Sequence, residues 1–247
     1  MVALNIVAGI DNLKLLNKIK GKLERVIFNK EYIRDVADFV RAYSAVAEMQ
    51  NDYFKGQDKN FKAKDYHSAL KQVAVNNTID GLTESGVRAN VLRPINDLLL
   101  TGITSGQSYA QLEEALRKTL TETEGNPGAL SRYAKTYATD SINQFSREYL
   151  TVISSDLGYE WYVYRGSNKA TTREFCEHMR KKEFVHKSEF PDILRGKIDG
   201  HQCRIYDKTG LPYGMKEGTN VDNLTANCGG WNCGHQLVPL REESVPE

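Results

Sequence analysis

Side chains that ligate soft metal ions are concentrated at one end of this sequence. Residues 176–247 contain all four cysteines and four of the five histidines, the exception being His67. The densest stretch, residues 227–235, reads NCGGWNCGH, and turn-forming glycines recur throughout the segment. Sulfur and imidazole donors presented by turns are typical of a structural zinc site. The segment therefore folds either around a metal ion or around buried, reduced thiols.

The ligand set that this pattern favours is Cys176, Cys228, Cys233 and His235, with Cys203 as the substitute. Zinc is the expected cofactor, and no other is indicated. The four residues between Cys228 and Cys233 are a wider spacing than the two-residue knuckle of a strong zinc signature. Small buried apolar thiols stay open as the alternative. A catalytic cysteine–histidine pair has no local signature in this chain.

Composition and charge exclude several classes of protein. The chain has 247 residues, of which 40% are hydrophobic and 26% are charged, as is ordinary for a globular protein. Its 33 basic and 32 acidic residues leave a net charge of +1, so any contact with nucleic acid must come from a local patch. Residues 1–10 do not resemble a signal peptide, and no window approaches the roughly 18 apolar residues of a membrane span. We therefore expect a cytoplasmic protein without a membrane partner.

Helical periodicity dominates the first part of the chain. A helix is expected to begin near Asp65 and to be interrupted by Gly81, Gly86 and Pro94. Further long helices are expected over residues 108–155. Apolar residues that recur every three or four positions mark an earlier helix: Ile33, Val36, Val40, Tyr43 and Ala47. The same spacing marks the last of the long helices: Ile142, Phe145, Tyr149 and Val152.

The period changes from helical to alternating after Gly158. One face of the expected strand carries Tyr159, Trp161 and Val163, and the other carries Glu160, Tyr162 and Tyr164. Residues 196–234 then contain eight of the 19 glycines, which predicts turns and short strands.

These patterns predict an α+β fold, with a helical N-terminal part followed by a small, turn-rich, β-containing C-terminal module. Residues 1–105 are expected to form a helical arm or docking region. Residues 106–247 are expected to form a second domain, in which the long helices over 108–155 precede a turn-rich β module over 156–240.

Arg165 lies at the end of the aromatic strand, as does the arginine that grips a dinucleotide phosphate in ADP-ribosyltransferases. Such an enzyme also needs a catalytic glutamate on a late strand, and the late acidic pair here, Glu242 and Glu243, is poorly placed for it. An ion pair or a turn-closing hydrogen bond is the other interpretation of Arg165. Trp231 is expected either to anchor its loop into a small core or to anchor an interface.

The order of these features resembles the family of phage head morphogenesis or minor head proteins that are similar to protein F of phage Mu. The resemblance spans residues 108–239. It rests on a helix that contains Tyr133 to Thr136 and Asn143 to Arg147, on the strand Tyr159 to Tyr164, and on the segments Thr172 to Cys176 and Gly229 to Pro239. Trp161, Arg173 and Trp231 are the binding or structural residues within these segments.

The resemblance implies a minor structural protein of a tailed phage or prophage, found in the virion and, during assembly, in the host bacterial cytoplasm. It implies several copies in an assembly, bound to the portal protein, the major capsid protein and viral DNA. The expected work is head assembly, DNA packaging or ejection. The residues favour such a binding role over an enzyme, because they show no catalytic constellation. An ADP-ribosyltransferase-like effector and a zinc-stabilised nucleic-acid-binding module are the alternatives.

One departure from the family pattern concerns Arg173. Many members would carry an aspartate shortly before the Thr-Arg pair, whereas residues 167–171 of this chain read SNKAT. A carboxylate partner for Arg173 is therefore not assured.

Overall fold

The computed structural model describes residues 21–104, 109–120, 128–167 and 169–245. The chain forms two compact units: unit 1 comprises Met1–Arg41 and Val75–Ala138, and unit 2 comprises Ala42–Ala74 and Thr139–Glu247. These units interleave along the chain, whereas the sequence analysis expected a linear division at residue 105. The docking role given there to residues 1–105 stays a prediction.

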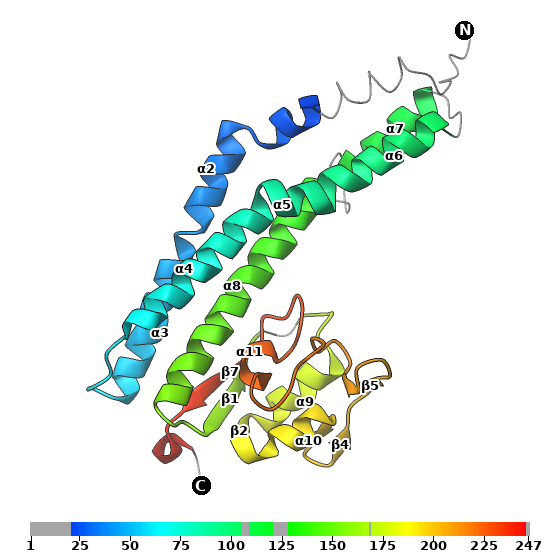
Figure 1. Cartoon of the computed structure of the whole chain (residues 1–247). Helices are drawn as coiled ribbons and strands as arrows, with labels where there is room; N and C mark the ends of the chain where they lie inside the picture. Colours follow the sequence, from blue (N-terminus) through cyan, green and yellow to red (C-terminus); the bar gives the residue numbers. More distant parts are fainter. Residues whose placement is uncertain (1–20, 105–108, 121–127, 168, 246–247) are drawn as a thin grey trace. The chain divides into compact units, whose positions relative to one another are not determined.

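The α+β fold class is confirmed (Figure 1). The helices are α2 (Lys30–Phe39), α3 (Ala42–Gln57), α4 (Asp65–Leu82), α5 (Glu84–Val87), π-helical η1 (Arg88–Leu92), α6 (Arg93–Thr104), α7 (Tyr109–Leu120), α8 (Ala129–Asp156), α9 (Glu174–Lys182), 3-10 helix η2 (Lys187–Glu189), α10 (Phe190–Leu194), α11 (Leu224–Asn227) and 3-10 helix η3 (Glu242–Ser244). The strands are β1 (Trp161–Arg165), β2 (Phe184–His186), β3 (Lys197–Ile198), β4 (His201–Gln202), β5 (Ile205–Tyr206), β6 (Leu211–Pro212) and β7 (Gln236–Leu240).

Helix α4 ends at Leu82, directly after Gly81, as expected, but a bend at Thr83 is followed by further helical structure that continues past Gly86 and Pro94 to Thr104. A Cβ atom at Gly81 would lie 2.0 Å from the ring of Tyr137, so this glycine allows two helical segments to pack closely. Pro94 falls in the first turn of α6, where a missing N–H is tolerated, and the π-helical turn η1 directly precedes it.

The core of unit 1 is formed by aliphatic side chains on η1 and on the helices next to it. The cluster consists of Ile27, Val87, Val91, Leu92, Ile95, Leu99 and Leu112. The Tyr133 hydroxyl donates a hydrogen bond to the carbonyl oxygen of Gly81 at 2.8 Å, and the Tyr137 hydroxyl donates one to that of Asn77 at 3.0 Å. These tyrosines attach the start of α8 to the second half of α4.

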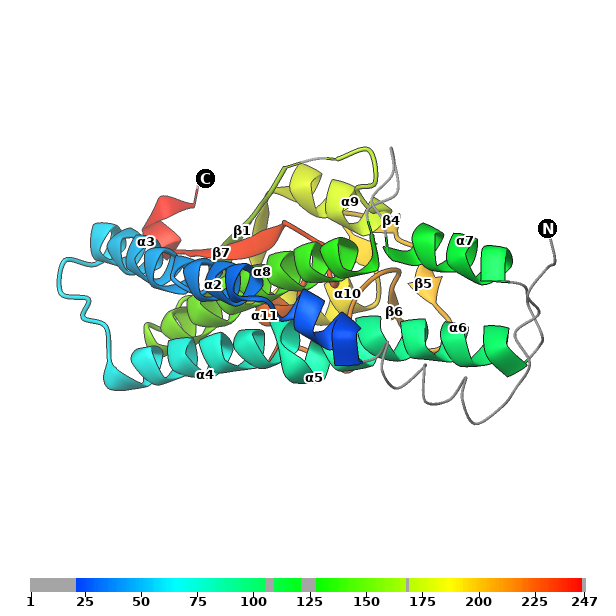
Figure 2. The same ribbon diagram turned by 90° about the horizontal axis from the view of Figure 1, so that it is seen from above.

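Unit 2 is organised around an antiparallel sheet with the strand order β2-β1-β7 (Figures 1 and 2). The central strand β1 pairs Val163 with both Phe184 of β2 and Val238 of β7. Because side chains alternate along a strand, Tyr162 and Tyr164 share one face of the sheet. That face belongs to the unit's core, which also includes residues of α9 and α10: Phe175, Met179, Phe190 and Ile193.

Helices α3 and α8 contact strand β7 of the sheet. Ser146 of α8 donates a hydrogen bond from its hydroxyl to Oε1 of Gln236 at 3.1 Å, and it accepts one from Nε2 of Gln50 at 2.7 Å. Tyr53 of α3 donates from its hydroxyl to the carbonyl oxygen of Pro239 at 2.5 Å. The segment Ala42–Ala74 therefore belongs to the same compact body as the C-terminal strand.

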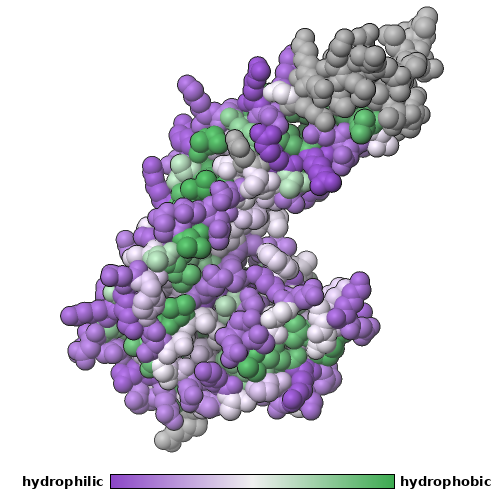
Figure 3. Space-filling view, in the orientation of Figure 1, coloured by the Kyte–Doolittle hydropathy of each residue, from purple (hydrophilic) through white to green (hydrophobic). Residues whose placement is uncertain are grey.

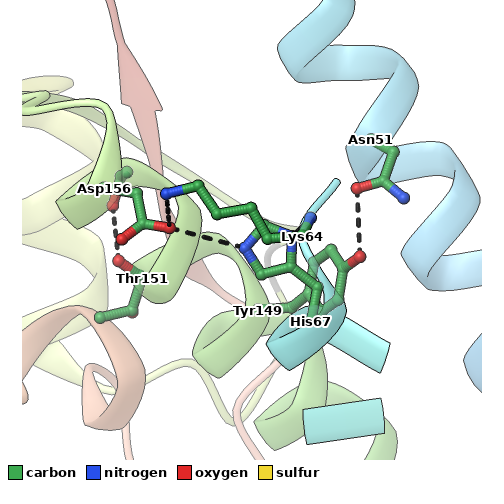
Figure 4. A network of polar contacts seen from close by, with 7 residues as sticks. Asn51, Lys64, His67, Tyr149, Thr151 and Asp156 are labelled. Atoms are coloured by element: carbon green, nitrogen blue, oxygen red, sulfur yellow. Dashed lines mark hydrogen bonds and ion pairs between the residues drawn. The ribbon is translucent and has the colours of Figure 1, made fainter. Parts of the chain in front are cut away.

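His67 lies in the core between α4 and α8, within a polar network (Figure 4). Only 2% of the residue is exposed. Its Nδ1 accepts a hydrogen bond from the backbone N–H of Lys64 at 3.1 Å, and its Nε2 lies 3.7 Å from the Asp156 carboxylate. Asp156 also forms an ion pair with the Lys64 ammonium group at 3.2 Å. Burial, followed by the charge of Lys64, lowers the pKa of His67 below its usual value.

This lowered pKa predicts a loss of stability in acid. The unfolded chain takes up a proton on His67 below about pH 6.5, whereas the folded chain takes it up only at lower pH, so the free energy of unfolding falls as the pH drops through this window. The variant His67→Gln should show a weaker decrease between about pH 7 and about pH 5. Denaturant titrations at each pH measure the two slopes, and parallel slopes would contradict the prediction.

The surface of unit 2 is mixed in character. On the face seen in Figure 3, hydrophilic residues surround smaller apolar areas. The exposed large apolar residues of this unit are Met49, Tyr66, Val73, Tyr206, Tyr213, Val221 and Trp231. In the described part of the chain, no helix has both the length and the apolar character needed to cross a membrane.

Candidate metal centre

Three separate elements of unit 2 bring candidate ligands together. Cys176 lies on the buried face of α9, Cys233 lies in the loop after α11, and His235 directly precedes β7. The exposed fractions of these residues are 1%, 5% and 5%. Their ligand atoms all lie within 4.8 Å of one another, so the cluster could hold a metal ion.

The distances between these atoms fit a tetrahedral ion. The two sulfur atoms of Cys176 and Cys233 are 3.7 Å apart, and Nδ1 of His235 lies 3.4 Å from the Cys233 sulfur. A tetrahedral zinc with Zn–S bonds of about 2.3 Å and Zn–N bonds of about 2.0 Å separates two sulfur ligands by about 3.8 Å, and a sulfur from a nitrogen by about 3.5 Å. The three side chains therefore need little rearrangement to share one zinc ion.

Tyr164 holds two of these ligands in place. Its hydroxyl donates a hydrogen bond to the Cys176 sulfur at 3.3 Å. Its ring stacks on the imidazole of His235, with ring centroids 5.4 Å apart and planes inclined by 2°. Burial raises the pKa of Tyr164 well above its usual value, so its hydroxyl stays protonated and able to donate. The sequence analysis placed Tyr164 on a strand face and did not predict this role.

The protonation of the two thiols is unequal. The hydrogen bond from Cys176, together with the contacts to His235, lowers the pKa of Cys233 to about 5. The same hydrogen bond, with burial, raises the pKa of Cys176. Burial raises the pKa of Cys228 to about 12 and that of Cys203 to about 11. Since a metal binds the thiolate form, Cys233 is the first sulfur in the cluster ready to act as a ligand.

The second ring nitrogen of His235, Nε2, is relevant to whether a metal could bind at Nδ1. Nε2 is buried and has no hydrogen-bond partner among the described residues. A buried polar atom without a partner costs about 1–3 kcal/mol. A metal bound at Nδ1 would leave the imidazole proton on Nε2, so ligation at Nδ1 would not itself remove this cost.

The structure brings together three of the four ligands expected from the sequence. Cys228 is fully buried next to Tyr164, but its sulfur lies outside the cluster of mutually close ligand atoms. Cys203, the expected substitute, lies beside Glu174 and is likewise not part of the cluster. The two glycines that follow Cys228 explain the separation, because Gly229 and Gly230 both adopt positive φ and turn the backbone before it reaches Cys233.

Arg173 holds the loop that carries Cys233. Its guanidinium donates hydrogen bonds to the carbonyl oxygens of Gly229 and Trp231. The carboxylate of Asp140 accepts a hydrogen bond from the backbone N–H of Asn232 at 2.6 Å. Arg173, for which the sequence assured no carboxylate partner, therefore has backbone carbonyls as partners.

The expectation that Trp231 anchors this loop into a core is wrong. Trp231 is 60% exposed, and its ring is covered only in part by Lys216, whose ammonium nitrogen lies 4.2 Å from the ring centroid. Backbone hydrogen bonds to Arg173 and Asp140 fix the loop, so the indole is free to face outward. The alternative role of Trp231, an interface anchor, stays a prediction.

A pocket with a volume of about 230 Å³ opens onto the cluster. It is lined by Ser167, Lys169, Thr171, Thr172, Arg173, Cys176, Asn232, Cys233, Gly234 and His235. This pocket gives the cluster a path to solvent, through which an ion or a water ligand could enter.

Arg165 and Trp161 lie at opposite ends of β1. Arg165 forms an ion pair with Glu183, with 2.6 Å between Nη2 and Oε1. The late glutamates Glu242 and Glu243 follow β7 beyond Leu240, which pairs with Trp161 at the far end of β1 from Arg165. The ring of Trp161 packs against His186 with centroids 4.9 Å apart. The sequence left two roles open for Arg165, phosphate binding and an ion pair. The structure shows the ion pair.

Comparison of the chain with family models, with curated proteins and with solved structures finds no match.

Gly166 offers a test of how tightly the imidazole is held. A Cβ atom at Gly166 would lie 2.5 Å from Cδ2 of His235, whereas one at Gly234 would meet nothing within 4 Å. Because His235 is buried and Gly166 has a φ of +157°, we expect Gly166→Ala to lower the free energy of unfolding by about 1–3 kcal/mol through overpacking and backbone strain. Gly234→Ala is the matched control and should have a much smaller effect. Equal effects in denaturant titrations would show that the imidazole is loosely held.

Proposed function

We propose that this chain is a minor structural protein of a tailed phage or prophage head, and that a zinc ion stabilises unit 2. In this proposal the protein binds the portal and the interior of the capsid shell and assists head assembly. Residues 1–105 supply the docking arm, of which Ala42–Ala74 also belongs to unit 2, and the rest of unit 2 supplies a recognition module. Viral DNA is a further proposed partner, through local contacts rather than through net charge.

The observation that carries this proposal is the convergence of the segments that resemble the phage family. Strand β1 pairs with β7, and Tyr164 of β1 contacts both Cys176 and His235. Arg147 of α8 donates a hydrogen bond to the carbonyl oxygen of Cys228 at 2.8 Å. Segments far apart in the sequence thus build one site, which supports a shared structural purpose for them.

The ligand chemistry supports zinc as the ion. Two thiolates and an imidazole are soft or borderline donors, which suit zinc better than calcium or magnesium. The fourth position is taken either by Cys228, after a rotation of its side chain, or by a water molecule from the pocket. In a structural site, the metal contributes directly to the stability of the folded unit.

Metal content tests the zinc part of the proposal. Tag-free protein, purified without chelator and dialysed extensively, should retain about one zinc per chain by elemental mass spectrometry. Cys233→Ser should lose this zinc and show a lower melting temperature. Cys203→Ser is the matched control, since Cys203 is also buried but lies outside the cluster, and it should keep the metal.

Two results would refine or overturn this part of the proposal. Retention of zinc in Cys228→Ser would identify water as the fourth ligand, and its loss would identify Cys228. Protein that carries no metal as purified, and that gains no thermal stability from added Zn²⁺, would mean that the cluster is a set of packed thiols.

Co-expression tests the role in the phage head. When produced together with the portal protein encoded by the same genome, the chain should elute with it in size-exclusion chromatography. A variant that begins at Ala42 keeps the segment of unit 2 that contacts β7, so it should show whether the first part of the proposed docking arm is required. A chain that never associates with the portal or the capsid shell would exclude the proposed function.

The enzymatic alternative receives less support from the geometry. Arg165 is engaged by Glu183, and the late glutamates lie at the opposite end of the sheet. Turnover of NAD by the purified protein, abolished in Arg165→Ala, would reverse this preference. A zinc-stabilised nucleic-acid-binding module would instead show binding that weakens steeply with salt.

A further inference from the structure

A second group of potential ligands lies on the outer face of α9. Glu174 and His178 are four residues apart, so they project from the same side of the helix. His201 of β4 reaches the same place from the hairpin formed by β3 and β4. Cys176 lies between Glu174 and His178 in sequence and points into the core, so α9 presents separate donor sets on its two faces.

The geometry of this group is compact. Nε2 of His201 lies 2.9 Å from Oε1 of Glu174, and the rings of His178 and His201 are stacked with centroids 3.5 Å apart and planes inclined by 6°. The ligand atoms of all three residues lie within 4.8 Å of one another. Around a metal with bonds of about 2.0–2.1 Å, neighbouring nitrogen and oxygen ligands are separated by about 2.9–3.4 Å. The 2.9 Å between His201 and Glu174 lies in this range, and the ligand atoms of the other pairs lie within 4.8 Å of each other.

Contacts outside the group hold its parts in place. Oε2 of Glu174 accepts a hydrogen bond from the backbone N–H of Arg204 at 3.1 Å, which leaves Oε1 directed toward His201. The ammonium group of Lys182, at the end of α9, forms an ion pair with Asp199 in the turn of the hairpin at 2.7 Å. The hairpin is therefore fixed to α9 on both sides of the histidine pair, as a preorganised binding site requires.

We propose that Glu174, His178 and His201 form a second, solvent-accessible site for a divalent transition-metal ion. Two imidazoles and one carboxylate suit Zn²⁺, Co²⁺, Ni²⁺ and Cu²⁺, and they disfavour Mg²⁺ and Ca²⁺. The side chains of Glu174 and His201 are 44% and 37% exposed, so the ion keeps open positions for water or for a ligand from a partner. This site does not depend on the proposed role in a phage head.

Titration of tag-free protein with Co²⁺ tests the second site. Cobalt bound by cysteine sulfur shows a strong thiolate-to-metal charge-transfer absorption, whereas cobalt bound by nitrogen and oxygen shows only weak visible bands. The native chain should bind one Co²⁺ of the second kind. His178→Ala and His201→Ala should each weaken this binding by about tenfold or more, without changing the zinc content of the cysteine site.

Controls separate loss of the site from loss of the fold. His186→Ala removes another histidine of unit 2 that lies outside the group, and it should bind Co²⁺ like the native chain. Glu174→Gln keeps the size of the side chain and an acceptor for Arg204, and it should weaken binding while preserving the circular dichroism spectrum. If the Glu174 and His178 variants bind Co²⁺ as tightly as His186→Ala, the group is a structural stack and the proposal is wrong.

Discussion

The buried phenol of Tyr164 is the contact on which the arrangement of unit 2 depends. Its strand is the centre of the sheet, its hydroxyl engages Cys176 of α9, and its ring supports His235 at the start of β7. A side chain with an apolar body and a polar tip can satisfy a sulfur acceptor inside a core without leaving a buried group unpaired. Helix, sheet and loop therefore meet at one residue.

The candidate metal centre could be predicted in part because its chemistry is visible in residue types. Cysteine and histidine are scarce, and their crowding identified Cys176, Cys233 and His235 from the sequence alone. Cys228 was also expected from the sequence, and its role as a ligand stays a prediction, because its sulfur lies outside the cluster of mutually close ligand atoms. Spacing alone does not reveal which way a backbone turns between two residues. Gly229 and Gly230, with positive φ, decide that direction.

Other features could not be predicted because a residue type permits more than one role. From the sequence, Gly81 and Gly86 were expected only to interrupt a helix. At Gly81, the missing side chain also makes room for the ring of Tyr137. Trp231 read as a core residue, but hydrogen bonds from Arg173 replace the anchoring that its ring would provide. The pairing of Glu174 with His178 carried a signal in its four-residue spacing, whereas the approach of His201 depends on a hairpin that local sequence does not specify.

The pairing of β1 with β7 has a consequence for how the chain is made. Residues that pair between these strands are far apart in sequence: Arg165 pairs with Gln236, and Trp161 pairs with Leu240. On the ribosome, the central strand emerges long before its partner, with Val163 and Tyr164 still lacking the neighbours that later cover them. Contacts of such long range form slowly. Unit 2 thus cannot complete its sheet until the segment Gln236–Leu240 has been synthesised.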